Sequence, residues 1–236
     1  DYNITVTRVS LDGTIDWDPA VIVNRDTSSS HVNHSASLRE GDGVYFSWMS
    51  TDGLNYFLDL QKINFDGSCD YAADYTLITH ETGFNHQSVR VLPSGNLLVT
   101  FSMIVDYQNV LATVVLDPDF TPFAPPSTLV EPTTLEHVTS CRVGVSPSGG
   151  AMVIWTAVGE YLSHLYAMNV GNLGQPLWPA RRTLETQPDD IVYFGLGFTK
   201  NSGLDGGFKM HWVDNRNHAL HGFGCRFESP VQPSMV

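Results

Sequence analysis

A short strand-like run that ends in an aromatic residue recurs four times along this chain of 236 residues. Each copy follows a turn that contains glycine, and the four aromatic residues are Trp48, Phe101, Trp155 and Trp212. Successive aromatic residues are 53, 54 and 57 residues apart. A repeat of this length whose units consist of strands is typical of β-propellers and related arrays. The repeat therefore constrains the architecture of the protein more than its chemistry.

Each repeat unit contains four strand patterns. A second strand follows the aromatic-ended run and ends in a turn signal; its copies lie at 4–11, 56–65, 110–116, 162–170 and 220–227. A third strand, rich in hydroxyl and β-branched residues, follows at 21–23, 76–78, 128–130 and 183–184. A fourth strand leads into the next glycine turn, at 35–38, 87–92, 140–145 and 192–198.

Four short antiparallel strands per unit predict an all-β fold, a β-propeller of four-stranded blades. We expect residues 1–236 to form one domain, with repeat units at about 1–42, 43–95, 96–149, 150–206 and 207–236. The chain contains four first strands but five second strands, so the ring has about five blades with one incomplete, or belongs to a larger propeller. An open edge would be unusual. We therefore expect assembly with flanking sequence or with another chain.

The charge of the chain limits its partners. There are 25 acidic and 12 basic residues, for a net charge of −13. Such acidity argues against nucleic acid and against an anionic membrane surface as partners. No run approaches the roughly 20 apolar residues of a membrane helix, so no membrane insertion is expected. A cation, a neutral sugar or a basic partner stays open, and a carbohydrate or protein partner is expected.

One unit carries a family resemblance. The run 149–155 is Gly-Gly-Ala-Met-Val-Ile-Trp, the run 165–170 is Leu-Tyr-Ala-Met-Asn-Val, and Gly174 and Trp178 follow. This pattern resembles a β-propeller repeat of secreted surface proteins from Bacteroidetes-like bacteria, whose architecture is similar to that of sialidase-like and carbohydrate-binding propellers. The resemblance implies an extracellular location or one on a cell or particle surface.

Sialidase-type enzymes would also show Asp-box turns, an arginine triad for a carboxylate and a Tyr–Glu nucleophile pair. No Asp box is present in the sequence. Three arginines, Arg39, Arg90 and Arg142, lie on the fourth-strand patterns and could form a triad. Because they recur at the repeat period, a structural role is the favoured interpretation.

Candidate ligand-binding residues lie where two fourth strands begin and beside two third strands. They are Asn33, His34, Asn85, His86, Trp17 and Trp178, with His137 near the matching place in the next unit. Histidines repeated at one end of a propeller could act as a general base, and an indole beside a carboxylate could stack on a sugar ring. The alternative is that the polar residues belong to loops and the indoles to the core.

No metal centre or cofactor is predicted, although calcium is possible. The acidic turn residues Asp12, Asp66, Asp117 and Asp119 could supply oxygen ligands to Ca²⁺. Turn formation explains the same residues equally well.

Function is only weakly constrained, since the common catalytic motifs are missing from the sequence. The first hypothesis is a non-catalytic binding or scaffold module with a carbohydrate or protein ligand. The second is a propeller-type glycoside hydrolase or polysaccharide lyase, with histidines and arginines at the end of the central channel. The third is a structural subunit of a larger surface assembly. The unit at 188–212 departs most from the repeat, which keeps the enzyme hypothesis open.

Overall fold

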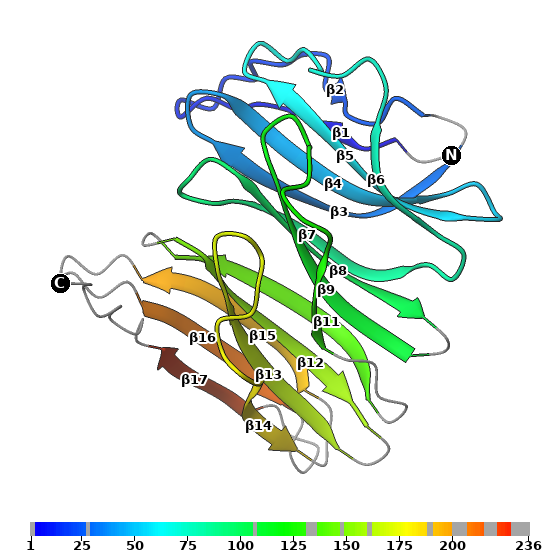
Figure 1. Ribbon diagram of the computed structural model, residues 1–236. Coiled ribbons are helices and arrows are strands. Elements are labelled where there is room, and N and C mark those ends of the chain that lie inside the picture. The colour runs from blue at the N-terminus through cyan, green and yellow to red at the C-terminus, as the bar shows by residue number, and fades with distance from the viewer. Residues whose placement is uncertain are drawn as a thin grey trace, which may run out of the picture.

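The computed structural model of the protein is built entirely from β-strands in the part of the chain that it describes (Figure 1). The described residues are 3–26, 29–105, 108–130, 136–146, 149–159, 162–187, 191–199, 207–214 and 221–227. They form three four-stranded antiparallel sheets, one three-stranded sheet and one two-stranded sheet. The predicted all-β propeller of antiparallel blades is confirmed.

The sheets follow one another in chain order. Blade 1 comprises β3 (Ser30–Arg39), β4 (Gly43–Thr51), β5 (Tyr56–Asn64) and β6 (Tyr75–His80). Blade 2 comprises β7 (Phe84–Val91), β8 (Leu97–Val105), β9 (Gln108–Leu116) and β10 (Ser127–Val130). Blade 3 comprises β11 (His137–Val145), β12 (Ala151–Val158), β13 (Ser163–Val170) and β14 (Arg182–Gln187). Blade 4 comprises β15 (Ile191–Thr199), β16 (Gly207–Asp214) and β17 (His221–Phe227), and β1 (Thr5–Val6) pairs with β2 (Val21–Ile22).

The blades differ in phase from the predicted repeat units. Each sheet begins with the strand that the sequence pattern placed last in a unit, and this strand pairs with the aromatic-ended strand that follows it. A predicted unit such as 43–95 therefore spans parts of two blades. The order of the strand types along the chain is as expected.

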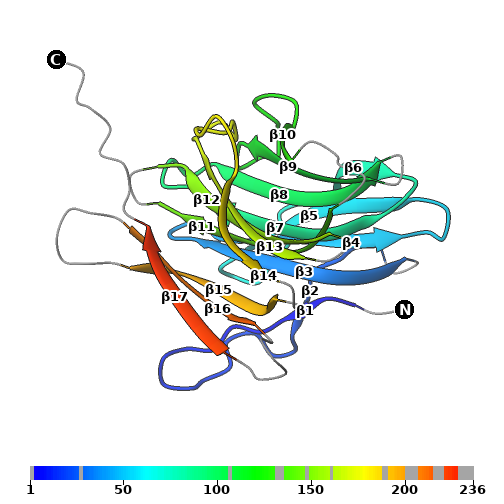
Figure 2. The same ribbon diagram turned by 90° about the horizontal axis from the view of Figure 1, so that it is seen from below.

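The first strands of consecutive blades, β3, β7, β11 and β15, contact one another and form the inner wall of the arc that Figure 2 shows from below. Neighbouring first strands run in the same direction. The hydrogen bonds between β7 and β3 show this, since the amides of Val89 and Val91 donate to the hydroxyls of Ser35 and Ser37, in the same order along both strands. The starting ends of these strands consequently lie at one end of the wall, which we call the mouth.

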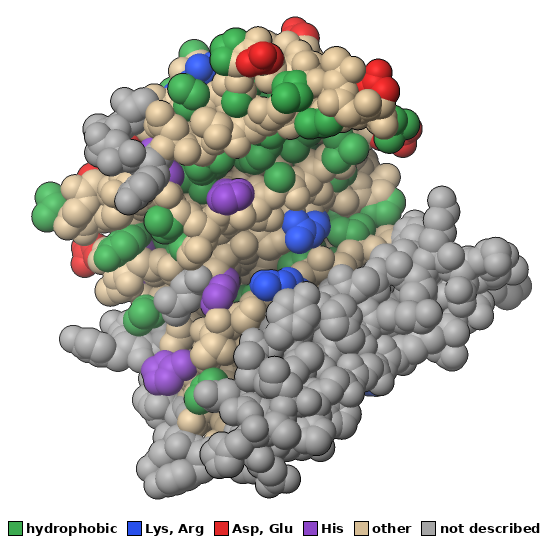
Figure 3. Space-filling view, turned by 180° about the vertical axis from the view of Figure 1, so that it is seen from behind, with side chains coloured by type: hydrophobic (Ala, Val, Ile, Leu, Met, Phe, Trp, Pro, Cys, Tyr) green, Lys and Arg blue, Asp and Glu red, His purple; other side chains and the backbone are tan. Residues whose placement is uncertain are grey.

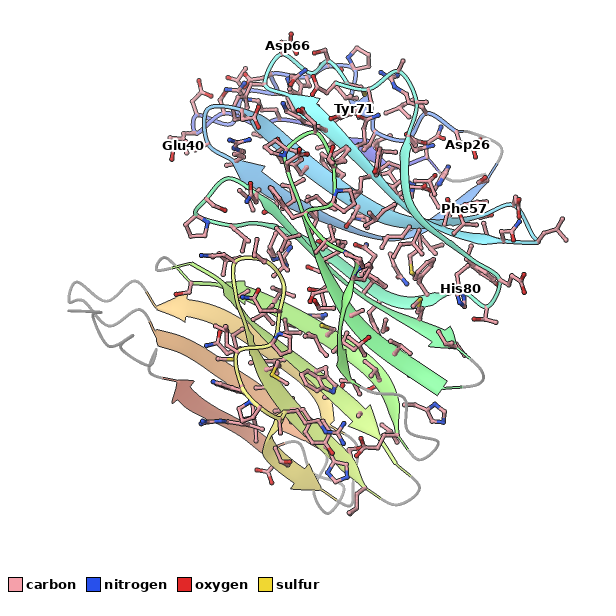
Figure 4. All side chains as sticks on the ribbon, viewed as in Figure 1. Asp26, Glu40, Phe57, Asp66, Tyr71 and His80 are labelled. Atoms are coloured by element: carbon pink, nitrogen blue, oxygen red, sulfur yellow. The ribbon has the colours of Figure 1, made fainter. Side chains whose placement is uncertain are left out.

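The aromatic residue of each described repeat packs between sheets, where side chains fill the space (Figure 4). Trp155 is buried in a cluster with residues of blade 2, and Phe101 in a cluster with residues of blade 1. Trp48 packs against the N-terminal segment. The predicted packing role is confirmed for these three residues, whereas the side chain of Trp212 lies outside the described residues.

The N-terminal segment is an incomplete blade. An isolated bridge, Val9 to Ile15, joins the second-strand and third-strand regions there. Matching bridges recur in the next three blades: Ile63 to Cys69, Leu116 to Pro122 and Val170 to Pro176. The segment at 4–11 is therefore a copy of the second strand, as the sequence pattern indicated.

In blades 1 and 3 the residue five before the aromatic is a glycine, and the backbone is crowded there, whereas blade 2 has Asn96 at this position. A Cβ on Gly43 would lie 2.6 Å from the carbonyl oxygen of Ile63, and one on Gly150 would collide with the carbonyl of Val170. Gly150 also has a φ of 71°, which disfavours side chains. Gly43 thus allows close pairing of β4 with β5, and Gly150 allows close pairing of β12 with β13.

We expect Gly150→Ala to destabilise the protein more than Gly53→Ala. Gly53 has a φ of 89° with open space around it, so its substitution carries only the backbone cost of about 1–2 kcal/mol. Gly150→Ala adds the collision with the carbonyl of Val170, which lowers stability by about a further 1–3 kcal/mol. Urea unfolding of both variants measures the difference, and equal losses would contradict this account of the repeat.

Candidate functional site

Asn33 and His34 lie at the mouth end of the inner wall. They occupy a β-bulge between Val32 and Ser35, and Asn33 has a positive φ of 51°. Both residues are exposed. The side-chain amide of Gln87, on the neighbouring blade, donates a hydrogen bond to the carbonyl oxygen of Asn33. The bulge is thus fixed against β7, and it presents polar groups to solvent.

His86 is the half-buried histidine of the mouth. It lies near the start of β7 and makes a hydrogen bond with the backbone of Thr139 on β11. Burial lowers the pKa of His86, and the positive charge of Arg142 lowers it further, whereas the bond with Thr139 raises it. The net shift is downward, so the imidazole is neutral at pH 7 and can accept a proton. The side chain of Asn85 lies outside the described residues.

The histidines do not repeat at one position. His86 pairs with Ser102, one residue after the aromatic of its blade, whereas His137 pairs with Val158, three residues after it. His34 lies in the bulge, where pairing is interrupted. His137 therefore lies near the position that matches His86 but two residues away from it, because bulges shift the start of each first strand.

Of the two candidate indoles, Trp17 belongs to the core, and Trp178 is partly buried against it. Trp17 is 8% exposed, and its indole N–H donates to the carbonyl oxygen of Phe65 at 3.3 Å. Trp178 packs against the cluster between blades 2 and 3, and the Arg182 guanidinium covers its ring at 4.3 Å. The structure does not support the predicted sugar-stacking role for either, since their ring faces already have protein neighbours.

The three arginines share a strand face but not a position. Arg39 pairs with Gly43, Arg90 with Leu98 and Arg142 with Ile154. These partners lie five, three and one residue before the aromatic of their blades. The arginines thus move two residues closer to the mouth in each blade, and the expectation that they recur at equivalent positions is wrong.

Arg90 joins three strands of the inner wall. Its Nη1 donates to Ser35 Oγ at 3.1 Å, to the carbonyl oxygen of Ala36 at 3.4 Å and to its own strand at Val89 at 2.7 Å. Its Nε donates to the carbonyl oxygen of Val143 at 3.4 Å on the other side. These contacts fit the structural role that the sequence favoured.

Arg90 is also a positive charge without a carboxylate partner within the described ranges. Burial lowers the pKa of its guanidinium, and so does the positive charge of Arg142. Arg39 differs, because it forms an ion pair with Asp42 at 3.1 Å. A guanidinium that is partly desolvated and not neutralised attracts an anion.

Arg142 is exposed on β11 and donates to the carbonyl oxygen of Cys141 at 2.8 Å. Its charge acts on both His86 and Arg90. We call His86, Arg90 and Arg142 the mouth cluster: His86 lies near the start of β7, Arg90 lies four residues further from the mouth on the same strand, and Arg142 lies on β11. On the face turned away from the viewer in Figure 1, Lys or Arg side chains lie next to one another among histidines, and visible acidic side chains lie toward the edges (Figure 3). The mouth cluster is therefore a local cationic site on an acidic protein.

A second polar cluster lies within blade 3. Tyr166 donates to Glu136 Oε1 at 2.6 Å, and Arg181 Nη2 lies 2.7 Å from Glu136 Oε2 and stacks on the Tyr166 ring at 4.0 Å. A Tyr–Glu pair is the sialidase-type nucleophile. Here burial, followed by the bond to Glu136, raises the pKa of Tyr166 and opposes formation of a phenolate. Tyr166 pairs with the buried Trp155, away from the inner wall. We assign this cluster to packing.

The acidic turns are closed by their own side chains. Asp12, Asp66 and Asp117 each accept a hydrogen bond from the backbone amide two residues later. Asp66 lies at the tip of the turn after β5 (Figure 4). Within the described ranges, no three His, Cys, Asp or Glu side chains are grouped as a metal site would require. Turn formation accounts for these carboxylates.

No helix that could cross a membrane occurs in the described part of the chain. Comparison with family models and with curated proteins finds no match. Among solved structures, an endo-arabinase from Bacteroides thetaiotaomicron is similar, with a TM-score of 0.56, 10% identity, and coverage of 99% of this chain and 88% of that one. An ulvan lyase bound to a GlcA(1-4)Rha3S fragment has a TM-score of 0.59 and 9% identity over 96% of this chain, and 59% of its own length is covered. At this identity the similarity shows the fold, a propeller that carbohydrate-active enzymes also use.

The sequence contained a signal for the mouth cluster. The arginines are spaced by 51 and 52 residues, whereas the aromatics of the same blades are spaced by 53 and 54. That deficit of two residues indicates positions that depart from the repeat, and departure from symmetry is expected at a site formed only once.

The buried carboxyl of Asp59, outside the mouth, allows a test of how burial changes a pKa and the pH dependence of stability. This carboxyl is 5% exposed and accepts hydrogen bonds from Ser50 and, at 2.7 Å, from Thr76. Burial raises its pKa. The folded state then holds a proton that the unfolded state has lost, so stability falls as pH rises from the unfolded pKa of about 3.9 through the raised folded value.

We expect Asp59→Asn to remove this decline. Urea unfolding between pH 4 and pH 7, run on both proteins, should show that the stability of the parent relative to the variant decreases with pH. A constant difference across this range would contradict the assignment of a raised pKa to Asp59.

Proposed function

We propose that this protein is a carbohydrate-active propeller enzyme, a polysaccharide lyase that binds an acidic polysaccharide at the mouth cluster. The observation that carries the proposal is the gathering of two guanidiniums and one neutral imidazole on adjacent first strands, with Arg90 lacking a described carboxylate partner. The fold likeness to an arabinan-cleaving enzyme and to an ulvan lyase supports an enzyme over a non-catalytic module.

The arginines suit the acidic group of the sugar. A guanidinium forms charge-assisted hydrogen bonds to a carboxylate or sulfate and keeps its charge at every accessible pH. Two such groups beside each other would neutralise a uronate carboxylate. Neutralisation matters because it makes the adjacent C5 proton of the sugar more acidic. The acidic remainder of the protein repels a polyanion, so attraction is confined to the mouth.

His86 suits the base of an elimination. In the proposed step its imidazole takes the C5 proton, the C5–H electron pair forms the C4–C5 double bond, and the C4–O glycosidic bond breaks. The imidazolium then returns the proton to the leaving oxygen, so no water is consumed. A lowered pKa favours this role, because the base form is present at neutral pH.

A hydrolase reading has less support from the described contacts. Glycoside hydrolysis uses two carboxylates that face each other across the scissile bond. The charge that acts on both His86 and Arg90 is that of Arg142. This chemistry fits binding of a negative group better than protonation of a neutral glycoside.

A non-catalytic module remains the second candidate, because the hydrogen bonds of Arg90 to three inner strands are those of a brace. Either function on a polymeric substrate fits the proposed location outside the cell or on its surface. The experiment below separates the two.

The test is incubation with polysaccharides that contain uronic acid, with arabinan as the neutral control. A lyase produces unsaturated uronates, which absorb in the ultraviolet, whereas a hydrolase produces reducing ends without this absorbance. We expect absorbance to rise only with the acidic substrates. Reducing ends from arabinan, or binding without any product, would overturn the lyase proposal.

We expect His86→Gln to lower kcat by at least about 100-fold with little change in the affinity for substrate, because the base is lost while the arginines remain. Arg142→Gln should lower kcat/KM by about 10-fold or more, the loss of one charge-assisted bond. The matched control is Arg8→Gln, the same change in charge on the N-terminal segment, where Arg8 pairs with Asp16. An equal loss of kcat/KM in Arg8→Gln would show that the effect of Arg142→Gln comes from the change in net charge and not from the mouth cluster.

The acid limb of the pH profile provides an independent check. Because burial lowers the pKa of His86, its base form persists below the ordinary value of about 6.5. We expect kcat/KM to fall with a midpoint below that value, and Arg142→Gln to move the midpoint upward, since a nearby positive charge is removed. A midpoint above the ordinary value would exclude His86 as the base.

A further inference from the structure

The bulge on β3 holds one residue in a sparsely populated backbone conformation. Asn33 has a φ of 51°, in the left-handed region that side chains other than those of asparagine and aspartate rarely adopt. Such a conformation persists only where the surrounding structure imposes it, and it is concentrated at sites that bind ligands. The contacts around Asn33 therefore decide whether the bulge is a site or a local irregularity.

Gln87 of the neighbouring blade fixes one end of the bulge. Its side-chain amide donates to the carbonyl oxygen of Asn33 and, at 3.1 Å, to that of Ser47, and its side-chain oxygen accepts from the Ser47 hydroxyl. Gln87 directly follows His86 in the sequence, and consecutive side chains of a strand point to opposite faces. The anchor of the bulge is thus the immediate neighbour of the proposed base.

Arg90 and Val89 fix the other end of the bulge. The hydroxyl of Ser35 accepts from Arg90 Nη1 at 3.1 Å and from the backbone amide of Val89 at 3.4 Å. His34 lies between the two anchored residues, Asn33 and Ser35. The bulge is therefore attached to β7 at both ends, and one attachment is a guanidinium of the mouth cluster.

The side chains of Asn33 and His34 are available to a ligand. Both residues are exposed, and no hydrogen bond or ion pair among the residues that the structure describes engages either side chain. The amide of an asparagine offers two donors and an acceptor, and the ring nitrogens of an imidazole can donate or accept. These groups suit the recognition of sugar hydroxyls better than the neutralisation of an acidic group.

The strand that carries the bulge provides no positive charge for a second acidic sugar. The strand Ser30–Arg39 contains one arginine and no lysine. This arginine, Arg39, lies at the end away from the mouth and pairs with Asp42 at 3.1 Å. An anionic group at the bulge would also be repelled by the net charge of −13. An uncharged sugar meets neither obstacle.

We infer that the bulge at Asn33 and His34 is a specificity subsite of the mouth, which binds an uncharged sugar linked to the uronate. This inference rests on the proposed binding of a uronate at the mouth cluster. With the carboxylate against Arg90 and Arg142, the next sugar toward blade 1 meets the bulge. The substrate class is then a polysaccharide in which uronate alternates with a neutral sugar, rather than a polymer of uronate alone.

Two hexasaccharides test this preference. One has glucuronate at every position, and in the other glucuronate alternates with an uncharged hexose. Titration calorimetry measures both affinities without requiring catalysis. We expect the alternating hexasaccharide to bind at least about tenfold more tightly, the effect of one or two hydrogen bonds. Equal affinities, or tighter binding of the polymer of glucuronate alone, would overturn the inference.

The variants Asn33→Gly and His34→Ala separate the subsite from the effect of net charge. Glycine adopts a positive φ readily, so Asn33→Gly removes the amide without straining the bulge. Each variant should bind the alternating hexasaccharide about three- to tenfold more weakly and the all-glucuronate one as the parent does. His80→Ala, at the end of the strand of blade 1 furthest from the inner wall, is the matched control for His34→Ala and should change neither affinity. A preference that survives both substitutions would overturn the assignment of the subsite.

Product formation separates this inference from the proposed function. Selective binding of the alternating hexasaccharide without unsaturated product would contradict the lyase and support the subsite. Unsaturated product from both hexasaccharides, bound with equal affinity, would support the lyase and overturn the subsite. Failure of both to bind would overturn the two proposals together.

Discussion

Burial of the two faces of each blade is the constraint on which the rest of the structure depends. Trp48, Phe101 and Trp155 are at most 1% exposed because each sheet is covered by the blade before it. Close strand pairing makes this possible, and it demands glycine where Gly43 and Gly150 meet backbone carbonyls. The repeated aromatic and, in blades 1 and 3, the glycine thus serve one requirement, that sheets pair closely and stack.

Stacking also creates the inner wall, and the wall positions the chemistry. Since first strands of neighbouring blades run in the same direction, His86 on β7 meets Thr139 on β11, and Arg90 reaches strands on both sides. His86 and Arg90 are consequently held largely by main-chain partners. Partial desolvation keeps the imidazole of His86 neutral and favours attraction of an anion by the Arg90 guanidinium, even though the protein as a whole is strongly acidic.

Sequence reasoning was reliable for features that depend on local pattern. Strand order, the aromatic packing positions and the identity of the N-terminal segment as a second-strand copy follow from alternation, glycine turns and period. Strand pairing is a tertiary property, so the sequence pattern did not predict which strand begins each blade. The bulges near the starts of β3, β7 and β11 shift register without a signal in composition, and they misalign the histidines. The sequence around Trp17 and Trp178 does not distinguish an exposed loop position from a core position, because burial of these indoles depends on the neighbouring blade.

The position of a bound acidic oligosaccharide tests the account most directly. In a crystal structure of the protein with a uronate-containing oligosaccharide, we expect a sugar carboxylate against Arg90 and Arg142 and the C5 atom of the same ring next to the His86 imidazole. An oligosaccharide bound elsewhere on the blades, with these three side chains still making only their contacts within the inner wall, would contradict it.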